Sequence, residues 1–244
     1  MSHSWRFRLS GLLKEKILAQ YGIAYSRRGL ESGLVPFLRP AVPITLVDIG
    51  ASSGSFTAAV LAHSGIRRAL LAEPQPQRCR ELEARFPDRR FTVRECAVSD
   101  LNGTADMDIL NFDYSSSLLP VLPGVGGIGR QLDLSVRERV GVTVRTLDDL
   151  LSEAGWSEGI DLLKIDTQGT ELQALRGAEG SLSRVRLIWT EVSFRPMYEG
   201  SAVFSDVHEF LHRHGFRFHS LHEGFRGTDR ELLQADALFL GPTA

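Results

Sequence analysis

Acidic residues stand at or near the ends of four apolar runs, where buried strands would stop. Asp48 and Glu73 close the first two runs, and Asp166 and Glu191 close two later ones. Because the carboxyl ends of parallel strands meet at one edge of a sheet, the sequence predicts that these side chains line one crevice. Carboxylates there can accept hydrogen bonds from hydroxyl groups, balance a cationic ligand or take up a proton.

A turn of small residues follows Asp48 and leads into a helix, in the pattern D-x-G-x-S-x-G. Glycine lets the backbone approach a ligand, and the free amides of the helix N-terminus face it. A dinucleotide site uses G-x-G-x-x-G to seat a diphosphate. The Asp48 carboxylate would repel a diphosphate, but it would attract the cationic amino group of a methionine moiety. The turn therefore favours S-adenosylmethionine over a nicotinamide dinucleotide. The cofactor contacts expected here are Asp48, Gly50, Ala51, Ser52, Gly54 and Phe56.

The ends of the next two strands supply the other expected cofactor contacts. Glu73 lies about 20 residues beyond the turn, where an acidic side chain accepts hydrogen bonds from both ribose hydroxyls, and Pro74 ends the strand. Cys96 and Ala97, at the end of the third strand, should border the adenine ring. Backbone amides or Asp100 are the alternative adenine contacts.

Apolar runs alternate with helical patterns from Pro43 onward, which is typical of a parallel sheet covered by helices on both faces. The predicted strands are Ile44–Ile49, Arg68–Glu73, Phe91–Val98, Ile160–Ile165 and Val185–Val192, with a terminal hairpin of Phe216–His219 and Ala235–Leu240. The predicted helices are Gly54–His63, Gln77–Phe86, Leu147–Ala154, Gly169–Arg176 and Phe204–His214. The pattern predicts an α/β fold with a Rossmann-like sheet of seven strands, parallel except for the last.

Two further segments lie outside this rhythm. Asn111–Arg130 is rich in serine and glycine and reads as a functional loop, flanked by Thr104–Leu110 and Arg139–Arg145, which could pair as an antiparallel ribbon. Met1–Tyr21 has apolar residues at near-helical spacing. We therefore expect an N-terminal helical extension or lid over residues 1–42 and one domain over residues 43–244.

Composition limits the partners and the compartment. The 244 residues carry a formal net charge of −2, so no bulk positive field draws the chain to nucleic acid. Two cysteines, Cys79 and Cys96, argue for a reducing compartment, the cytoplasm, and no apolar run is long enough to span a bilayer. The N-terminal helix could pack on the domain or contact a membrane surface, and a homo-oligomer remains open.

The chain resembles the FkbM-type S-adenosylmethionine-dependent methyltransferases over about Leu46 to Leu240. The motifs that carry the resemblance are Val47-Asp48-Ile49-Gly50-Ala51 with Gly54 and Phe56-Thr57, Thr146-Leu147-Asp148-Asp149-Leu150, Lys164-Ile165-Asp166 with Gly169 and Glu171, Glu191, and Tyr198-Glu199-Gly200. Members usually carry a second acid before that glycine, where this chain has Gln168. The resemblance implies O-methylation of a hydroxyl on a sugar, glycolipid or polyketide-like product.

The expected catalytic residues are Asp166, Glu191 and Lys164. Asp166 and Glu191 end neighbouring strands, and together they could act as a general base or hold a divalent cation through oxygen ligands. Lys164 lies two residues before Asp166, hence on the same sheet face, and needs a carboxylate partner. A buried structural ion pair is the alternative role for this lysine.

The acceptor should meet residues beyond the strand ends, and Ser116, Arg195 and Tyr198 are the candidates. Two other functions stay open on the sequence: a nicotinamide-dependent oxidoreductase and a non-catalytic cofactor-binding protein. His208-Glu209-Phe210-Leu211-His212 fits the H-E-x-x-H pattern of zinc proteases, but its apolar spacing is that of a helix covering the sheet.

Overall fold

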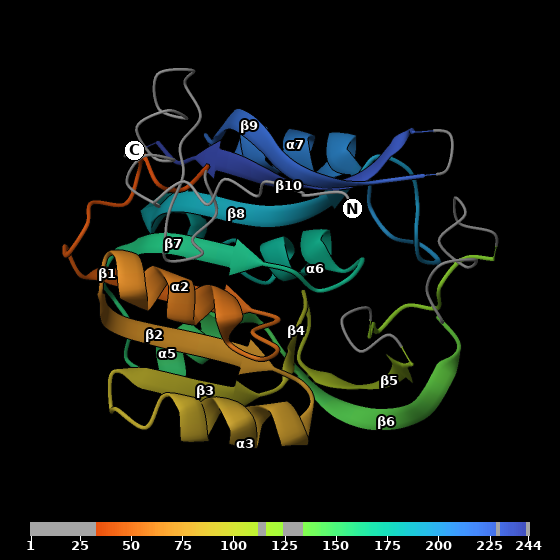
Figure 1. Cartoon of the computed structure of the whole chain (residues 1–244), viewed down its shortest axis with the longest axis horizontal. Coiled ribbons are helices and arrows are strands. Elements are labelled where there is room, and N and C mark those ends of the chain that lie inside the picture. Colours follow the sequence, from red (N-terminus) through yellow and green to blue (C-terminus); the bar gives the residue numbers. More distant parts are fainter. Residues whose placement is uncertain (1–32, 112–115, 124–133, 228–229, 243–244) are drawn as a thin grey trace, which may run out of the picture.

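The computed structural model describes residues 33–111, 116–123, 134–227 and 230–242, and its centre is a twisted sheet of seven strands (Figure 1). Across the sheet the order is β3 (Phe91–Glu95), β2 (Ile66–Glu73), β1 (Ile44–Ile49), β7 (Ile160–Ile165), β8 (Val185–Ser193), β10 (Leu232–Leu240) and β9 (Arg217–Arg226). The first five strands in this order, β3, β2, β1, β7 and β8, pair in parallel, whereas β10 is antiparallel to both of its neighbours, β8 and β9. The predicted seven-stranded sheet, parallel except for its last strand, is confirmed.

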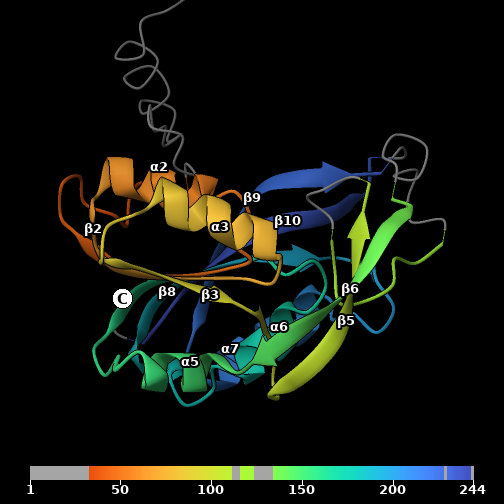
Figure 2. The ribbon, with the colours of Figure 1, turned by 90° about the horizontal axis from the view of Figure 1, so that it is seen from below.

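Helices cover both faces of this sheet (Figure 2). On one side lie α2 (Ser55–His63) and α3 (Pro76–Arg85), and on the other lie α5 (Leu147–Glu153), α6 (Glu171–Arg176) and α7 (Phe204–Arg213). A short 3₁₀ helix, η2 (Leu182–Arg184), precedes β8. Thr146 caps α5 by accepting a hydrogen bond from the Asp149 amide.

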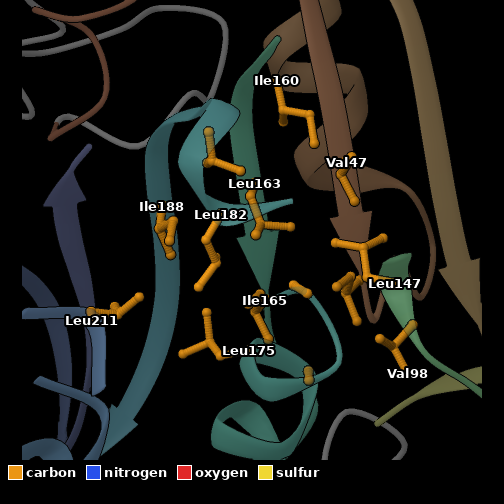
Figure 3. Packing of buried hydrophobic residues seen from close by; sticks show 14 of the residues in the cluster. Val47, Val98, Leu147, Ile160, Leu163, Ile165, Leu175, Leu182, Ile188 and Leu211 are labelled. Carbon is orange, nitrogen blue, oxygen red and sulfur yellow. The ribbon is translucent and has the colours of Figure 1, made fainter. Parts of the chain in front are cut away.

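Residues of the central strands alternate between two hydrophobic cores. Val47 and Leu163 face α5, α6 and α7, as Figure 3 shows around Leu147 and Leu175, and their neighbours Leu46 and Leu162 pack in the core beneath α2 and α3. Both faces are therefore buried, which explains why these strands read as continuous apolar runs rather than as alternating ones.

The segment just before β1 belongs to the second of these cores. Leu34 and Leu38 are 0% and 1% exposed and pack with Leu46 and Leu187. Part of the expected extension over residues 1–42 thus lies against the sheet. The helix expected at Met1–Tyr21 falls outside the described residues, so its role as a lid or membrane contact stays a prediction.

A second, three-stranded sheet lies beyond the carboxyl ends of β2 and β7 (Figure 1). Its order is β4 (Ala97–Val98), β6 (Val136–Arg145) and β5 (Gly103–Leu110). The antiparallel pairing of β5 with β6 confirms the expected ribbon. The predicted strand Phe91–Val98 was wrong in one respect: it leaves the main sheet after Glu95, because Ala97 and Val98 pair with β6.

The C-terminal hairpin is longer than expected, since β9 extends to Arg226 and β10 begins at Leu232. Within the predicted loop, Ser117 bridges to Asp108 of β5 and Val121 bridges to Tyr198. These bridges tie the loop to β5 and to the segment between β8 and α7. Among the helices that the structure describes, none is long and apolar enough to cross a membrane.

Candidate active site

The glycine turn is fixed at the carboxyl end of β1 by its two neighbouring strands. The Gly50 and Ala51 amides donate to the Ala72 carbonyl of β2 at 2.9 and 3.1 Å, and the Asp166 amide donates to the Ile49 carbonyl at 3.1 Å. Gly50 has a φ of 73°, and a Cβ at this position would lie 1.9 Å from the Asp166 carbonyl oxygen. Only glycine allows this close approach of the two strand ends.

Asp48 lies wholly buried beneath the turn, with 0% exposure. One carboxylate oxygen accepts from the Thr57 hydroxyl at 2.6 Å, and the other lies 3.2 Å from Nζ of Lys164. This places the Asp48 charge against a lysine of the chain itself. Asp48 has no exposed surface in this conformation, and its expected contact with a cofactor amino group stays a prediction.

Lys164 joins the turn to the acid at the end of its own strand. Its Nζ donates to the Gly50 carbonyl at 2.7 Å and lies 3.6 Å from Oδ2 of Asp166. Burial acts to lower the pKa of Lys164, but the carboxylates of Asp48 and Asp166 outweigh burial and raise it above its ordinary value. The ammonium therefore stays charged and ties the end of β1 and its turn to the end of β7.

Glu73 ends β2 and faces the turn from the other side. Its Oε2 accepts from the Ser52 amide at 2.9 Å, and its Oε1 accepts from the Gln75 amide at 3.0 Å. Burial raises the pKa of Glu73, and the two amide hydrogen bonds work against that effect. Each oxygen keeps a second lone pair, so the carboxylate can accept hydrogen bonds from the two hydroxyls of a ribose ring.

The remaining expected cofactor contacts lie around this turn in different environments. Gly54 packs on α3, where a Cβ would lie 2.6 Å from the Phe86 ring, and Phe56 is half-buried with Nζ of Lys164 6.0 Å from its ring centre. Pro74 is half-buried. Cys96 packs in the main core, where burial raises the pKa of its thiol to about 11, and Ala97 lies buried in β4. The Cys96 thiol is thus a core group.

A second polar group, the Gln168 cluster, consists of Asp166, Gln168, Glu191, Tyr198 and Gln234. The Gln168 amide nitrogen donates to Oδ1 of Asp166 at 2.7 Å and to Oε2 of Glu191 at 3.1 Å. The Tyr198 hydroxyl donates to the Gln168 side-chain oxygen at 2.9 Å, and Gln234 donates to the same Glu191 oxygen at 3.0 Å. The cluster connects the ends of β7, β8 and β10.

The acids of this cluster differ in exposure and in their neighbours. The Asp166 side chain is 41% exposed. Burial, with the nearby carboxylates of Asp166, Glu171 and Asp236, raises the pKa of Glu191 well above its usual range. Burial also raises the pKa of Tyr198. Asp166 and Glu191 are both partly exposed, and the two acids differ in that the raised pKa of Glu191 favours its protonated form.

Glu171 shapes the turn between β7 and α6. Its Oε1 accepts from the Thr167 and Gly169 amides at 2.9 and 3.1 Å. Gln168 lies between them with a φ of 55°, and a Cβ on Gly169 would lie 2.7 Å from the Tyr198 ring. The Glu171 carboxylate thus accepts hydrogen bonds from the backbone of the turn, and the Tyr198 ring packs against Gly169.

The three residues expected to contact the acceptor lie in different environments. Tyr198 is 5% exposed and belongs to the Gln168 cluster. The Ser116 hydroxyl accepts from the Leu110 amide at 3.4 Å, and it is the neighbouring Ser117 that donates to the Gln168 carbonyl at 2.6 Å. Arg195 is exposed and pairs with Glu231 at 3.0 Å.

Sequence reasoning gave no role to three residues that the structure places in these networks: Thr57, Gln168 and Gln234. All are uncharged, so neither charge nor spacing separates them from ordinary surface residues. The departure at Gln168 from the expected acid was the one available signal.

In the described part of the chain, no three His, Cys, Asp or Glu side chains lie close enough together to hold a metal ion. Between Asp166 and Glu191 lies an amide that donates to both. His208 and His212 stack on α7 with ring centres 6.0 Å apart, on the helix expected to cover the sheet.

Comparison with known proteins places this geometry in a family. Residues 48–218, well over half of the chain, match the methyltransferase FkbM domain. The chain belongs to the FkbM methyltransferase family. The resemblance seen in the motifs is thereby confirmed, and family membership, which implies S-adenosylmethionine as the methyl donor, decides against a nicotinamide-dependent oxidoreductase.

One protein with a similar sequence and one solved structure are compared with this chain. The chain is 33% identical over 185 residues to the 2-O-methyltransferase NoeI of Sinorhizobium fredii (strain NBRC 101917 / NGR234), covering 73% of this chain and 74% of that protein. The crystal structure of methyltransferase FkbM from Methylobacillus flagellatus KT matches with a TM-score of 0.55 and 19% identity over 90% of this chain. This chain spans 49% of that protein, and the likeness supports the fold alone.

Proposed function

We propose that this FkbM family member is an S-adenosylmethionine-dependent O-methyltransferase that methylates a hydroxyl of a saccharide or saccharide-bearing acceptor. One observation carries the proposal: the glycine turn, Glu73 and the exposed carboxylate of Asp166 meet at the carboxyl ends of β1, β2 and β7. The relative NoeI, by its name, methylates an oxygen, which supports a hydroxyl as the acceptor.

The residues around the turn fit the cofactor in three ways. The free lone pairs of Glu73 suit the ribose hydroxyls, and the Gly50–Gly54 turn presents a backbone without bulky side chains. Asp48 and Lys164 hold the turn from below. Pro74, Cys96 and Ala97 are retained as the proposed border of the adenine site, with Cys96 contributing backbone rather than thiol.

When bound, S-adenosylmethionine would supply a methyl group on a positively charged sulfur, and the sulfur would leave as a neutral thioether with the electron pair of the C–S bond. The chain has to hold the acceptor oxygen in line with that bond and remove its proton. Asp166 is the residue proposed to take the proton, because it is exposed at the junction of the turn and the Gln168 cluster. Lys164 and Gln168 fix the orientation of its carboxylate.

The acceptor side of the site supports a hydroxyl-rich ligand. Gln168 and Gln234 are neutral and partly exposed beside Asp166 and Glu191. Neutral amides at this edge of the sheet suit an uncharged, hydroxyl-bearing acceptor. Ser116 and Arg195 are proposed for the rim of this region, and a homo-oligomer remains compatible with it.

Two measurements test the proposed function. Calorimetry should detect binding of S-adenosylhomocysteine and no heat with NAD. Transfer of a tritiated methyl group to a panel of oligosaccharides and glycan extracts should then separate an active enzyme from a non-catalytic binding protein. Absence of any calorimetric or thermal-shift response to both S-adenosylmethionine and its demethylated product would refute the proposal.

A further inference from the structure

Gln168 uses all the hydrogen-bonding groups of its side chain inside the site. Both N–H groups of its amide donate, one to Asp166 and one to Glu191, and its oxygen accepts from Tyr198. Its backbone carbonyl also accepts from Ser117 at 2.6 Å. A glutamine with this many partners at the end of a central strand connects four segments of the chain.

The orientation of the amide follows from the partners. Carboxylate oxygens of Asp166 and Glu191 need donors, and the Tyr198 hydroxyl has a proton to give. Turning the amide round would set its oxygen against the Asp166 carboxylate and lose a hydrogen bond to it. We therefore assign the amide nitrogen to the side of the two acids and the amide oxygen to the side of Tyr198, which satisfies all three contacts.

The backbone at Gln168 aims the side chain into this position. Its φ of 55° lies in the left-handed region, which residues with a Cβ rarely adopt. Glu171 holds the amides on both sides of it, and the Tyr198 ring packs against Gly169. The turn keeps an uncommon conformation that points one amide between two acids.

An N–H donor occupies the place that a bridging cation would need. A divalent cation takes six or more oxygen ligands, whereas the amide directs two hydrogens at the same two carboxylates. The described residues offer no third acidic, histidine or cysteine ligand there. The raised pKa of Glu191 agrees with a pair that is neutralised by a proton and by amides.

We propose that Gln168 is a positioning residue whose amide, in place of a divalent cation, holds Asp166 and Glu191 in register beside the acceptor oxygen. The inference rests on the proposed function for the role of Asp166. It adds that methyl transfer by this chain is independent of divalent metal, and that one substitution, Gln168→Glu, would convert the amide bridge into a three-carboxylate site.

The first part of the test titrates Mn²⁺ alone into the metal-free wild-type protein, the Gln168→Glu variant and the control Gln77→Glu on the exposed surface of α3. Gln168→Glu is expected to bind Mn²⁺, with no binding by the wild type or the control. Binding of Mn²⁺ by the wild type but not by Gln168→Glu, or by neither, would overturn the inference. S-adenosylhomocysteine affinity, read in the same samples, reports on the proposed function independently and shows that each variant is folded.

The second part measures methyl transfer to the panel of oligosaccharides and glycan extracts. Wild-type turnover should be unchanged by EDTA, whereas Gln168→Glu should lose at least about ten-fold in kcat with little change in KM for the methyl donor, because misplaced reacting groups cost rate rather than donor binding. A wild type that EDTA inactivates and Mg²⁺ restores would overturn the proposal, as would wild-type kcat in Gln168→Glu. The EDTA experiment needs no variant.

Discussion

Four carboxylates at one edge of the sheet have different neighbours, and these neighbours give each of them a different task. Asp48 is buried against Lys164, Glu73 is oriented by two backbone amides, and Asp166 is exposed. Glu191 is crowded by other acids and favours its proton. Residue type alone predicted one crevice, but environment separates a structural acid from a proposed ribose acceptor, a proposed base and a partner that favours its proton.

Replacing Asp166 tests the proposed base directly. Asp166→Asn should lower methyl transfer by about 10²- to 10⁴-fold, because the amide cannot take up the acceptor proton. S-adenosylhomocysteine affinity, measured by calorimetry, should stay within a few fold. Asp161→Asn is the matched control, since Asp161 lies at the opposite end of the same strand. Near wild-type turnover in Asp166→Asn would remove the assignment.

Glu191 should leave a signature in the pH dependence of stability. Its pKa is raised in the folded protein, so the folded state holds this proton more tightly than the unfolded chain does. That contribution is fully present below the ordinary glutamate value of 4.5 and is lost as the pH rises through the higher folded value. Lowering the pH from about 8 toward about 5 should therefore raise the Tm of the wild type relative to that of Glu191→Gln.

The comparison needs a glutamate without such crowding. Glu199 is exposed, and Glu199→Gln should give a Tm difference from the wild type that does not change over the same range. A constant Tm difference between the wild type and Glu191→Gln would show that Glu191 is ionised in the folded protein at neutral pH.

At the scale of elements, the glycine turn is fixed by steric contact as well as by conformation. Gly50→Ala should cost at least about 3 kcal/mol, because the new Cβ adds a clash with the Asp166 carbonyl to the strain of a positive φ. Gly155 has a φ of 65° with nothing near its Cβ position, so Gly155→Ala should cost about 1 to 2 kcal/mol. Urea unfolding gives both values, and equal losses would exclude the clash.

Elements were predictable where burial acts on both faces and less so elsewhere. The strands around Val47 and Leu163 were found because packing on two cores makes their runs apolar throughout. The departure of the chain from the main sheet at Cys96 was missed, since no glycine or proline marks it and Ala97 and Val98 are as buried as strand residues. The long hairpin was underestimated because β9 has little apolar periodicity.

In the candidate site, the charged residues could be predicted from the sequence, whereas the roles of the neutral residues could not. Asp166 and Glu191 were expected near each other, and the structure brings both onto Gln168. The contribution of Gln168 depends on one positive φ and on which way an amide points. Neither property has a sequence pattern, so a neutral residue such as Gln234 could be recognised only from its contacts.

At the scale of the whole molecule, the core extends into the segment before β1. Leu34→Ala should destabilise the protein by about 2 to 5 kcal/mol, the usual cost of emptying a fully buried leucine site. Val42, which is 50% exposed in the same segment, supplies the control, and Val42→Ala should change the free energy of unfolding by less than about 0.5 kcal/mol. Similar small losses for both would mean that the domain begins at residue 43.

The chain has three lysines, Lys14, Lys16 and Lys164, and the one in the site is 7% exposed and locked in ion pairs. Amine acylation requires a deprotonated, accessible nitrogen, and the raised pKa of Lys164 removes the first condition while burial removes the second. Succinimidyl dyes and amine-coupled sensor surfaces should therefore spare the catalytic region.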